Sequence, residues 1–344
     1  MIETVSNTDD AREAGSGIRV SVIIPIRNRV ALLEELLEAI RAQTYPTDQF
    51  EVFVMDNRST EDVAGTVEAF GRSVTFPVYY HLMEKDRGPV PARNLGAQKA
   101  NGEILAFTDS DCRPCPGWLE LGMSGFTDSI SLVSGEILHK AEQEVEFFSK
   151  MPVTMEGENP TYPAANIFYR KSVFHDFDGF DVSLWYDNPF HLPIESADTD
   201  LAWRIKKGGH ESAYIEGLHV YHEVEPQKPL NWLIEPTKAL VVPALVKRHP
   251  ELRDVILFKR TFFYKGSVIY YAAVPAGIAL AIIDWRLLAA VPLLILIRAL
   301  KRTQGYSPKA LAIATMQVCF NVARNYVFCL TMLYGSLRFR ELVL

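Results

Sequence analysis

The sequence has no excess of positive charge and little cysteine, and each shortage excludes a class of protein. Its formal net charge is −7, whereas a protein that mainly binds nucleic acid needs a basic surface for the phosphates. There are four cysteines, and two of them, Cys319 and Cys329, lie in an apolar C-terminal stretch. A disulfide framework is therefore not expected, and a reducing, cytosolic setting fits best.

An apolar run is also missing from the first 17 residues. Because residues 1–17 are polar and acidic, we expect a disordered lead-in there and no signal peptide. Apolar residues are otherwise plentiful, at 48% of the chain, which is enough for a sizeable core. Residues 259–344 carry 11 Lys and Arg against two acids, whereas the preceding 258 residues carry 24 basic and 40 acidic ones. A basic, apolar tail on an acidic body predicts contact with anionic lipid.

Strand and helix patterns alternate in the first half of the chain. Apolar, β-branched runs predict strands near 20–26, 50–55, 78–83 and 103–108, with helices between them. This order predicts an α/β fold with a mostly parallel sheet flanked by helices. Such sheets bind ligands at the carboxyl ends of their strands. Those ends carry Arg27-Asn28, Asp56-Asn57 and Asp109-Ser110-Asp111.

The segment Asp109-Ser110-Asp111 directly follows a predicted buried strand. Two carboxylates one residue apart form a hard-oxygen site that suits Mg²⁺ or Mn²⁺ held partly by substrate phosphates. Such a metal would offset the charge of a leaving diphosphate. Most Asp-x-Asp segments are solvated turns, but polar clusters at two other strand ends favour a functional site here.

The C-terminal part predicts association with a membrane. An apolar run from Phe262 to Ile283 is broken only by Lys265, and a second run follows Asp284-Trp285-Arg286. Basic residues flank both outer ends, so we expect an apolar hairpin at about 262–300 with both ends in the cytoplasm. An amphipathic helix at about 310–337 would lie in the interface. A buried, soluble helical subdomain is the alternative.

Five segments, in order, resemble those of family 2 glycosyltransferases of the GT-A fold, of the membrane-associated bacterial type. They are VSVIIPIRNR (20–29), EVFVMDNRST (51–60), the run Gly88–Pro114, AANIFYRKSVFHDFDGFD (164–181) and ADTDLAWRIKKGG (197–209). Each motif alone would be poor evidence, but five in the right order are specific. The resemblance implies a GT-A catalytic domain at 18–230, followed by the helical membrane-associated region at 231–344.

The resemblance also implies roles for individual residues. The nucleotide-sugar site would comprise Pro25, Ile26, Arg27, Asn28, Asp56, Asn57, Arg93, Asp109 and Ser110. Asn57 stands where many relatives carry a second Asp, so a different contact with the base is expected. Asp111 would bind the divalent metal, Mn²⁺ or Mg²⁺, together with Asp109. His222 would complete the metal shell or touch the diphosphate, although a packed histidine near the surface remains the alternative.

By the same resemblance, Asp198 matches the catalytic aspartate. One carboxylate must take the proton of the acceptor hydroxyl, and an inverting displacement needs no enzyme nucleophile. The sequence departs from the family here, because Ala197 stands where a Glu is usual, and Glu195 is the nearest substitute. Asp200 is the rival base, and either aspartate could instead cap the helix.

The sequence therefore predicts a hexosyltransferase with a UDP- or GDP-linked sugar donor and a glycan or glycolipid acceptor of the cell envelope. Its partners would include membrane lipid and no nucleic acid, and its catalytic domain would lie on the cytoplasmic side of the cell membrane. Two alternatives stay open. A sugar nucleotidyltransferase would want a glycine-rich loop after the first strand, and IPIRNRVALL has no glycine. A catalytically degenerate membrane scaffold has Ala197 as its only support.

Overall fold

The computed structural model describes residues 17–140, 142–151, 157–184, 186–187, 190, 193–194, 196–303 and 307–344. The predicted lead-in, apart from Gly17, and Glu195 lie outside these residues. Two compact units are present. The first comprises the described residues within 1–144, 151–185 and 195–225, and the second those within 145–150, 186–194 and 226–344.

The first unit contains an eight-stranded sheet with the order β3-β2-β1-β4-β8-β6-β11-β5. The strands are β1 (Val20–Ile26), β2 (Phe50–Asp56), β3 (Val78–Leu82), β4 (Ile104–Phe107), β5 (Cys112–Pro114), β6 (Ile130–His139), β8 (Ile167–Arg170) and β11 (Glu211–His222). Strands β1 to β4 pair in parallel, as do β6 and β11. Strand β8 is antiparallel to β4 and β6, and β5 is antiparallel to β11. The predicted mostly parallel sheet is confirmed.

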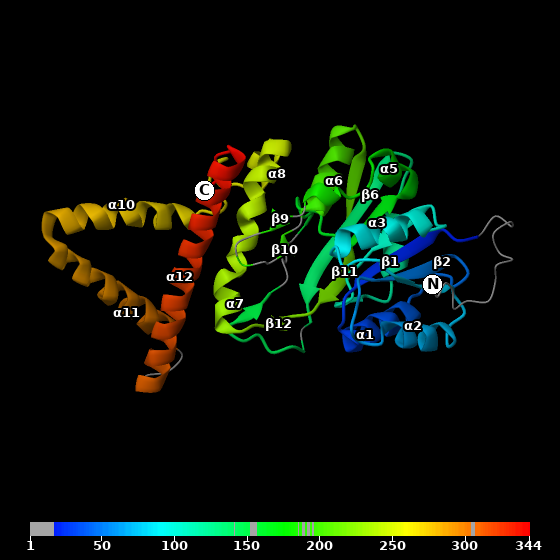
Figure 1. Cartoon of the computed structure of the whole chain (residues 1–344), viewed down its shortest axis with the longest axis horizontal. Helices are drawn as coiled ribbons and strands as arrows, with labels where there is room; N and C mark the ends of the chain where they lie inside the picture. Colours follow the sequence, from blue (N-terminus) through cyan, green and yellow to red (C-terminus); the bar gives the residue numbers. More distant parts are fainter. Residues whose placement is uncertain are drawn as a thin grey trace. The chain divides into compact units, whose positions relative to one another are not determined.

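Helices cover both faces of this sheet (Figure 1). They are α1 (Val30–Arg41), α2 (Val63–Gly71), α3 (Pro89–Lys99), α4 (Trp118–Ser124), α5 (Lys171–Asp176) and α6 (Ala197–Lys207), and a 3-10 turn, η2, spans Val182–Leu184. One core cluster joins the sheet to α1, α2 and α4, and the other joins it to α3, α5 and α6. Val22 of β1 belongs to the first cluster and Ile23 to the second. A strand that is covered on both faces is mostly apolar, as β1 is apart from Ser21, whose buried hydroxyl donates to the Glu51 carboxylate at 2.6 Å.

Helix α3 packs closely against the sheet because Gly96 has no side chain. A β-carbon at this position would lie 2.6 Å from Ile23 Cγ2. The close approach of α3 to β1 fixes the position of Arg93, which lies on the same helix.

The second unit is mainly helical. Its helical elements are α7 (Pro229–Ile234), η3 (Glu235–Val241), α8 (Val242–Arg248), α9 (Leu252–Val255), α10 (Ser267–Asp284), η4 (Trp285–Ala289), α11 (Ala290–Arg302) and α12 (Pro308–Phe339). Two short pairs of strands accompany them, β7 (Ser149–Lys150) with β12 (Glu225–Pro226) and β9 (Tyr186–Asp187) with β10 (Pro193–Ile194).

Helices α10 and α11 diverge from a bend, and α12 runs along their open side (Figure 1). The bend lies at Asp284, which has extended backbone angles, and its carboxylate accepts a hydrogen bond of 2.9 Å from the Arg286 N–H. Ala299 of α11 packs against Ala314 and Val318 of α12. Within the described part of the chain, the segment Ser267–Arg302 is long and apolar enough to cross a membrane.

Candidate active site

The Asp109-Ser110-Asp111 segment forms a turn between β4 and β5. The Cys112 N–H donates to the Asp109 carbonyl at 3.0 Å, which closes the turn. The Asp111 side chain is 9% exposed and the Asp109 side chain 28%. Ser110 is buried between them. The two carboxylates therefore lie at the carboxyl end of β4, as predicted for a ligand site of such a sheet.

His222 reaches this turn through strand pairing. The antiparallel register of β5 and β11 places His222 opposite Cys112, and the Glu223 N–H donates to the Asp111 carbonyl at 3.0 Å. As a result His222 Nε2 lies 3.5 Å from Asp111 Oδ1. Residues more than a hundred positions apart in the sequence thus meet at one carboxylate.

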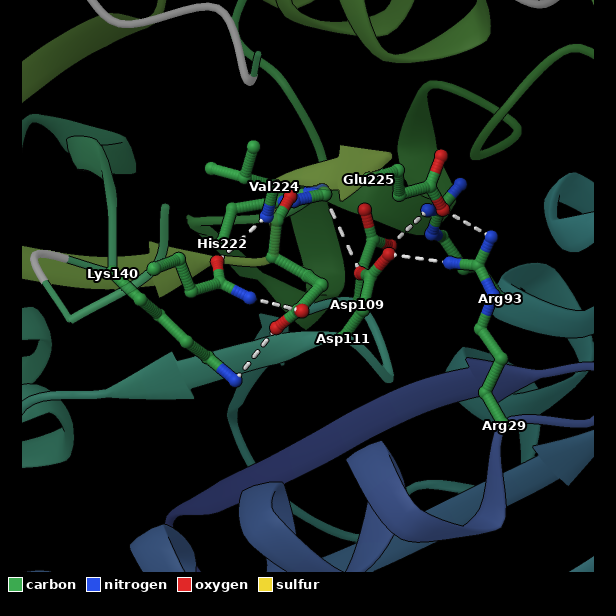
Figure 2. A network of polar contacts seen from close by, with 10 residues as sticks. Arg29, Arg93, Asp109, Asp111, Lys140, His222, Val224 and Glu225 are labelled. Atoms are coloured by element: carbon green, nitrogen blue, oxygen red, sulfur yellow. Dashed lines mark hydrogen bonds and ion pairs between the residues drawn. The ribbon is translucent and has the colours of Figure 1, made fainter. Parts of the chain in front are cut away.

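Each aspartate of the turn has an arginine partner (Figure 2). Arg93 of α3 is buried and forms an ion pair with Asp109. Arg29, at the start of α1, forms an ion pair of 2.7 Å with Asp111 Oδ2 and a second ion pair with Glu225. Sequence reasoning missed both Arg29 and Glu225. The signal available for Arg29 was its place in the polar loop after β1.

Burial raises the pKa of the Asp111 carboxyl, and the charge of Asp109 adds to this effect. His222 and Arg29 act in the opposite direction, but burial outweighs them. The carboxylate therefore gains more from a cation than a solvated aspartate would, because its charge is poorly hydrated.

The predicted nucleotide pocket begins with Asp56 at the end of β2. Asp56 is 2% exposed. Its Oδ2 accepts a hydrogen bond of 2.8 Å from the Tyr80 hydroxyl, and its Oδ1 accepts one of 2.8 Å from the Ser59 N–H. Tyr80 was not predicted from the sequence. The two contacts hold the Asp56 carboxylate at the rim of the sheet.

Asp86 connects two further residues of the predicted pocket. Asn57 Nδ2 donates to Asp86 Oδ1 at 2.6 Å, and Arg27 Nη1 lies 2.7 Å from Asp86 Oδ2. The Arg87 N–H also donates to Asn57 Oδ1 at 3.2 Å. Asp86 therefore binds the side chains of both Asn57 and Arg27. The sequence did not predict this role.

The remaining predicted pocket residues belong to β1 and its loop. Pro25 and Ile26 are buried and pair with Met55 and Asp56 of β2, and the Ile26 side chain belongs to the core cluster that contains α1, α2 and α4. Asn28 has a positive φ of 59°, and its Oδ1 accepts a hydrogen bond of 2.7 Å from the Thr60 N–H. This contact joins the loops that follow β1 and β2.

Asp198 and Asp200 lie in the first turn of α6 and have different surroundings. Asp198 is partly buried and accepts hydrogen bonds from the Thr199 N–H at 2.7 Å and the Ala164 N–H at 3.3 Å. Burial raises the pKa of the Asp198 carboxyl. Arg93 lowers this pKa and Asp109 raises it, so the charges of the Asp109 turn act on Asp198.

Asp200, in contrast, is fully buried and forms an ion pair of 2.7 Å with Arg204. Arg204 also donates to the Gly179 carbonyl at 2.7 Å. This arrangement fixes α6 to the loop after α5, which is a structural role. Asp198 and Asp200 are the two candidate bases. In the described part of the chain, the Asp198 carboxylate has no cationic side chain as a hydrogen-bond partner.

The donor atoms near Asp111 fit a divalent cation. Asp111, Cys112 and His222 each offer one ligand atom, and these atoms lie within 4.8 Å of one another. Carboxylate oxygen and imidazole nitrogen are suitable ligands for Mn²⁺. Burial raises the pKa of the Cys112 thiol well above its ordinary value, which disfavours the thiolate that would act as a ligand. Asp111 and His222, with Asp109 next to them, are therefore the residues that would hold a divalent cation.

The chain is similar to a known protein family and to several of its members. Residues 21–180 match the model of "Glycosyl transferase family 2". Glycosyltransferase AglE of Haloferax volcanii is 29% identical over 216 residues, which are 60% of this chain and 67% of that protein. The pre-mycofactocin glycosyltransferase of Mycobacterium tuberculosis is 28% identical over 222 residues, which are 60% of this chain and 43% of that protein. The chain thus spans less than half of the mycobacterial relative.

Among solved structures, a mannosyltransferase from Pyrobaculum calidifontis, in complex with GDP-Man and Mn²⁺, has a similar fold. The TM-score is 0.61 with 19% sequence identity, and the match covers 89% of this chain and 85% of that one. The GT-A fold is confirmed by this likeness together with the family match.

Proposed function

We propose the donor and the acceptor of this chain, which belongs to glycosyl transferase family 2 and is therefore a glycosyltransferase. It moves a sugar from a UDP- or GDP-linked donor to a hydroxyl group of a lipid-linked or cell-envelope glycan. The donor and the acceptor are proposals. The matched relatives are named for different substrates, and the chain spans only part of the mycobacterial one.

One observation carries this proposal. The Asp109 turn, His222 and Asp198 gather at one end of the sheet, with Arg93 linking the turn to α6 through its charge. A site that could hold a phosphate-bound cation near a carboxylate able to act as the base is what transfer from a nucleotide diphosphate sugar requires.

In the proposed reaction the acceptor oxygen attacks the anomeric carbon, and the bond from this carbon to the diphosphate oxygen breaks. Asp198 accepts the proton of the acceptor hydroxyl, and its raised pKa makes it a stronger base than an ordinary aspartate. Because the oxygen enters opposite the leaving group, the configuration inverts. Arg93 holds the Asp109 carboxylate in place at the diphosphate. A divalent cation at Asp111 and His222 would supply charge stabilisation for the leaving diphosphate.

The second unit supports a membrane location for this chemistry. The segment Ser267–Arg302 exposes a series of large apolar side chains, among them Ile282, Leu294 and Ile297. Exposed apolar surface of this extent calls for an apolar partner, and lipid fits α10, which is apolar on all sides. We propose that membrane lipid is the partner and that the catalytic unit lies on the cytoplasmic side, near lipid-linked acceptors.

Calorimetric titration of UDP and GDP, with and without Mn²⁺, tests the donor and the metal together. We expect one nucleotide to bind tightly in the presence of Mn²⁺ and to bind weakly to Asp111→Asn. Asn keeps the shape of the side chain and removes the charge that holds a cation. If a folded wild-type protein binds neither nucleotide, the proposed donor class is wrong.

A further inference from the structure

We propose that Arg29 competes with the divalent cation for Asp111, so that metal binding depends on the nucleotide donor. This inference rests on the proposed function, because it assumes that a cation acts at Asp111. It assigns a regulatory, positioning role to Arg29, which ends the first family-like segment (20–29) but is not among the predicted site residues.

The Asp111 carboxylate has a different neighbour at each of its two oxygens. Its Oδ1 lies 3.5 Å from His222 Nε2, and its Oδ2 lies 2.7 Å from Arg29 Nη1. A cation that uses Asp111 and His222 as ligands would lie close to the guanidinium. Because Asp111 is nearly buried, the repulsion between the two positive charges would be only weakly screened by water. The guanidinium must therefore move away when the cation binds.

The Arg29 backbone is held in place, whereas its side chain is partly exposed. Its φ is 62°, and its N–H and that of Val30 donate to the Glu61 carboxylate at 3.1 and 2.8 Å. The side chain, in contrast, is 46% exposed. Its second partner, Glu225, would hold the guanidinium next to the site after it leaves Asp111. Displacement therefore requires rotation of one side chain and no change of the loop.

The net charge around Asp111 changes sign when a divalent cation binds alone. Three carboxylates, those of Asp109, Asp111 and Glu225, face the two guanidinium groups of Arg29 and Arg93. A divalent cation alone turns this net charge of one negative into one positive. A nucleoside diphosphate brings at least two negative charges, and its phosphate oxygens can accept hydrogen bonds from the displaced guanidinium. The nucleotide-sugar donor thus offsets the electrostatic cost of binding the cation alone.

Mn²⁺ binding to the full-length protein, measured by calorimetry and by the EPR signal of free Mn²⁺, tests this coupling. The titration is done without nucleotide and with saturating UDP or GDP. We expect Arg29→Gln to bind Mn²⁺ alone about five- to tenfold more tightly than wild type, since a strong ion pair no longer competes. With nucleotide the difference should shrink to about twofold or less, because the diphosphate offers the arginine another partner.

Arg113→Gln is the matched control. Arg113 lies on β5, two residues after Asp111, but its guanidinium pairs with Glu142 at 2.6 Å. The same charge change there should leave Mn²⁺ affinity within about twofold of wild type, because a partly exposed charge at longer range is screened. Arg29→Lys provides a second variant that keeps the charge, and its ammonium cannot bridge Asp111 and Glu225 as the planar fork does. It should bind Mn²⁺ with an affinity between those of wild type and Arg29→Gln.

The inference is wrong if Arg29→Gln binds Mn²⁺ as weakly as wild type and Arg113→Gln, or more weakly. In that outcome the ion pair would only join the loop after β1 to the end of β11. The proposed function would survive if wild type still bound Mn²⁺ through Asp111 and lost it in Asp111→Asn. If Mn²⁺ bound to no variant with either nucleotide, both the inference and the proposed metal site would be overturned.

Discussion

Replacing Asp198 with asparagine should stabilise the protein and inactivate it at the same time. The carboxylate is partly buried, and among the described residues the backbone N–H groups of Thr199 and Ala164 donate to it. Burial raises its pKa, which means that the charged form is disfavoured in the folded state. Asparagine removes this charge and keeps one oxygen for the 2.7 Å hydrogen bond from the Thr199 N–H, whereas the 3.3 Å hydrogen bond from the Ala164 N–H, which ends at the other oxygen, is lost.

We expect a gain in the free energy of unfolding on the order of 1 kcal/mol at neutral pH. For a unit of this size such a gain raises the Tm by about 2–4 °C. Transfer should fall by about 10²–10⁴-fold, because the amide cannot accept the hydroxyl proton. Thermal unfolding followed by circular dichroism and a donor-hydrolysis-corrected transfer assay measure the two effects on the same samples.

The pH dependence gives an independent check. For a carboxyl whose pKa is raised in the folded state, the stabilising protonated form is complete below the ordinary value of 3.8 and is lost as pH rises through the folded-state pKa. The advantage of Asp198→Asn over wild type should therefore be largest at neutral pH and should vanish in acid. An advantage that stayed constant with pH would contradict the assignment of the effect to this carboxyl.

Asp200→Asn is the matched control on the same helix. Asp200 is fully buried and paired with Arg204, so its replacement leaves a poorly solvated cation and should cost about 3 kcal/mol or more. If Asp198→Asn lowered the Tm and Asp200→Asn did not, the roles that we assign to the two aspartates would be reversed.

Three further predictions concern the rest of the molecule. Tyr80→Phe removes the 2.8 Å hydrogen bond to Asp56, and should cost about 1–2 kcal/mol in thermal unfolding and weaken nucleotide binding in calorimetry; unchanged binding would remove Asp56 from the pocket. Gly96→Ala places a methyl group 2.6 Å from a side-chain carbon of β1, and should cost about 1–3 kcal/mol by the same unfolding assay; a neutral effect would mean that α3 can move. Leu294→Glu, in an exposed apolar position, should reduce flotation with anionic vesicles, whereas unchanged flotation would exclude this segment from the lipid contact.

The sequence predicted the parts of the fold that depend on local pattern. An apolar run such as β1 has to be covered on both faces, and the polar clusters at Asn28, Asp56 and Asp109 follow strands whose ends meet at one edge of the sheet. These features follow from strand order, which the alternation of strands and helices indicates.

The sequence could not predict contacts that depend on the register of distant strands. His222 meets Asp111 only because β5 and β11 pair with Cys112 opposite His222. Lys140 is a further example. It is buried, and its ammonium lies 2.6 Å from Glu35 Oε2 and 2.9 Å from Glu223 Oε2, which holds the end of β11 in place. A single lysine in a loop gives no sequence signal of this role, because both partners are far away in the chain.

The pairing of β5 with β11 also has a consequence for how the enzyme would fail. Strand β5 has three residues and lies at the edge of the sheet, yet its pairing with β11 brings Asp111, the residue just before β5, to His222. Edge strands this short open locally at a lower free energy than the central strands of the same sheet. Denaturant or heat should therefore separate the two halves of the centre while the core around β1 stays folded. Function would then be lost in a subglobal opening that the far-ultraviolet spectrum barely registers.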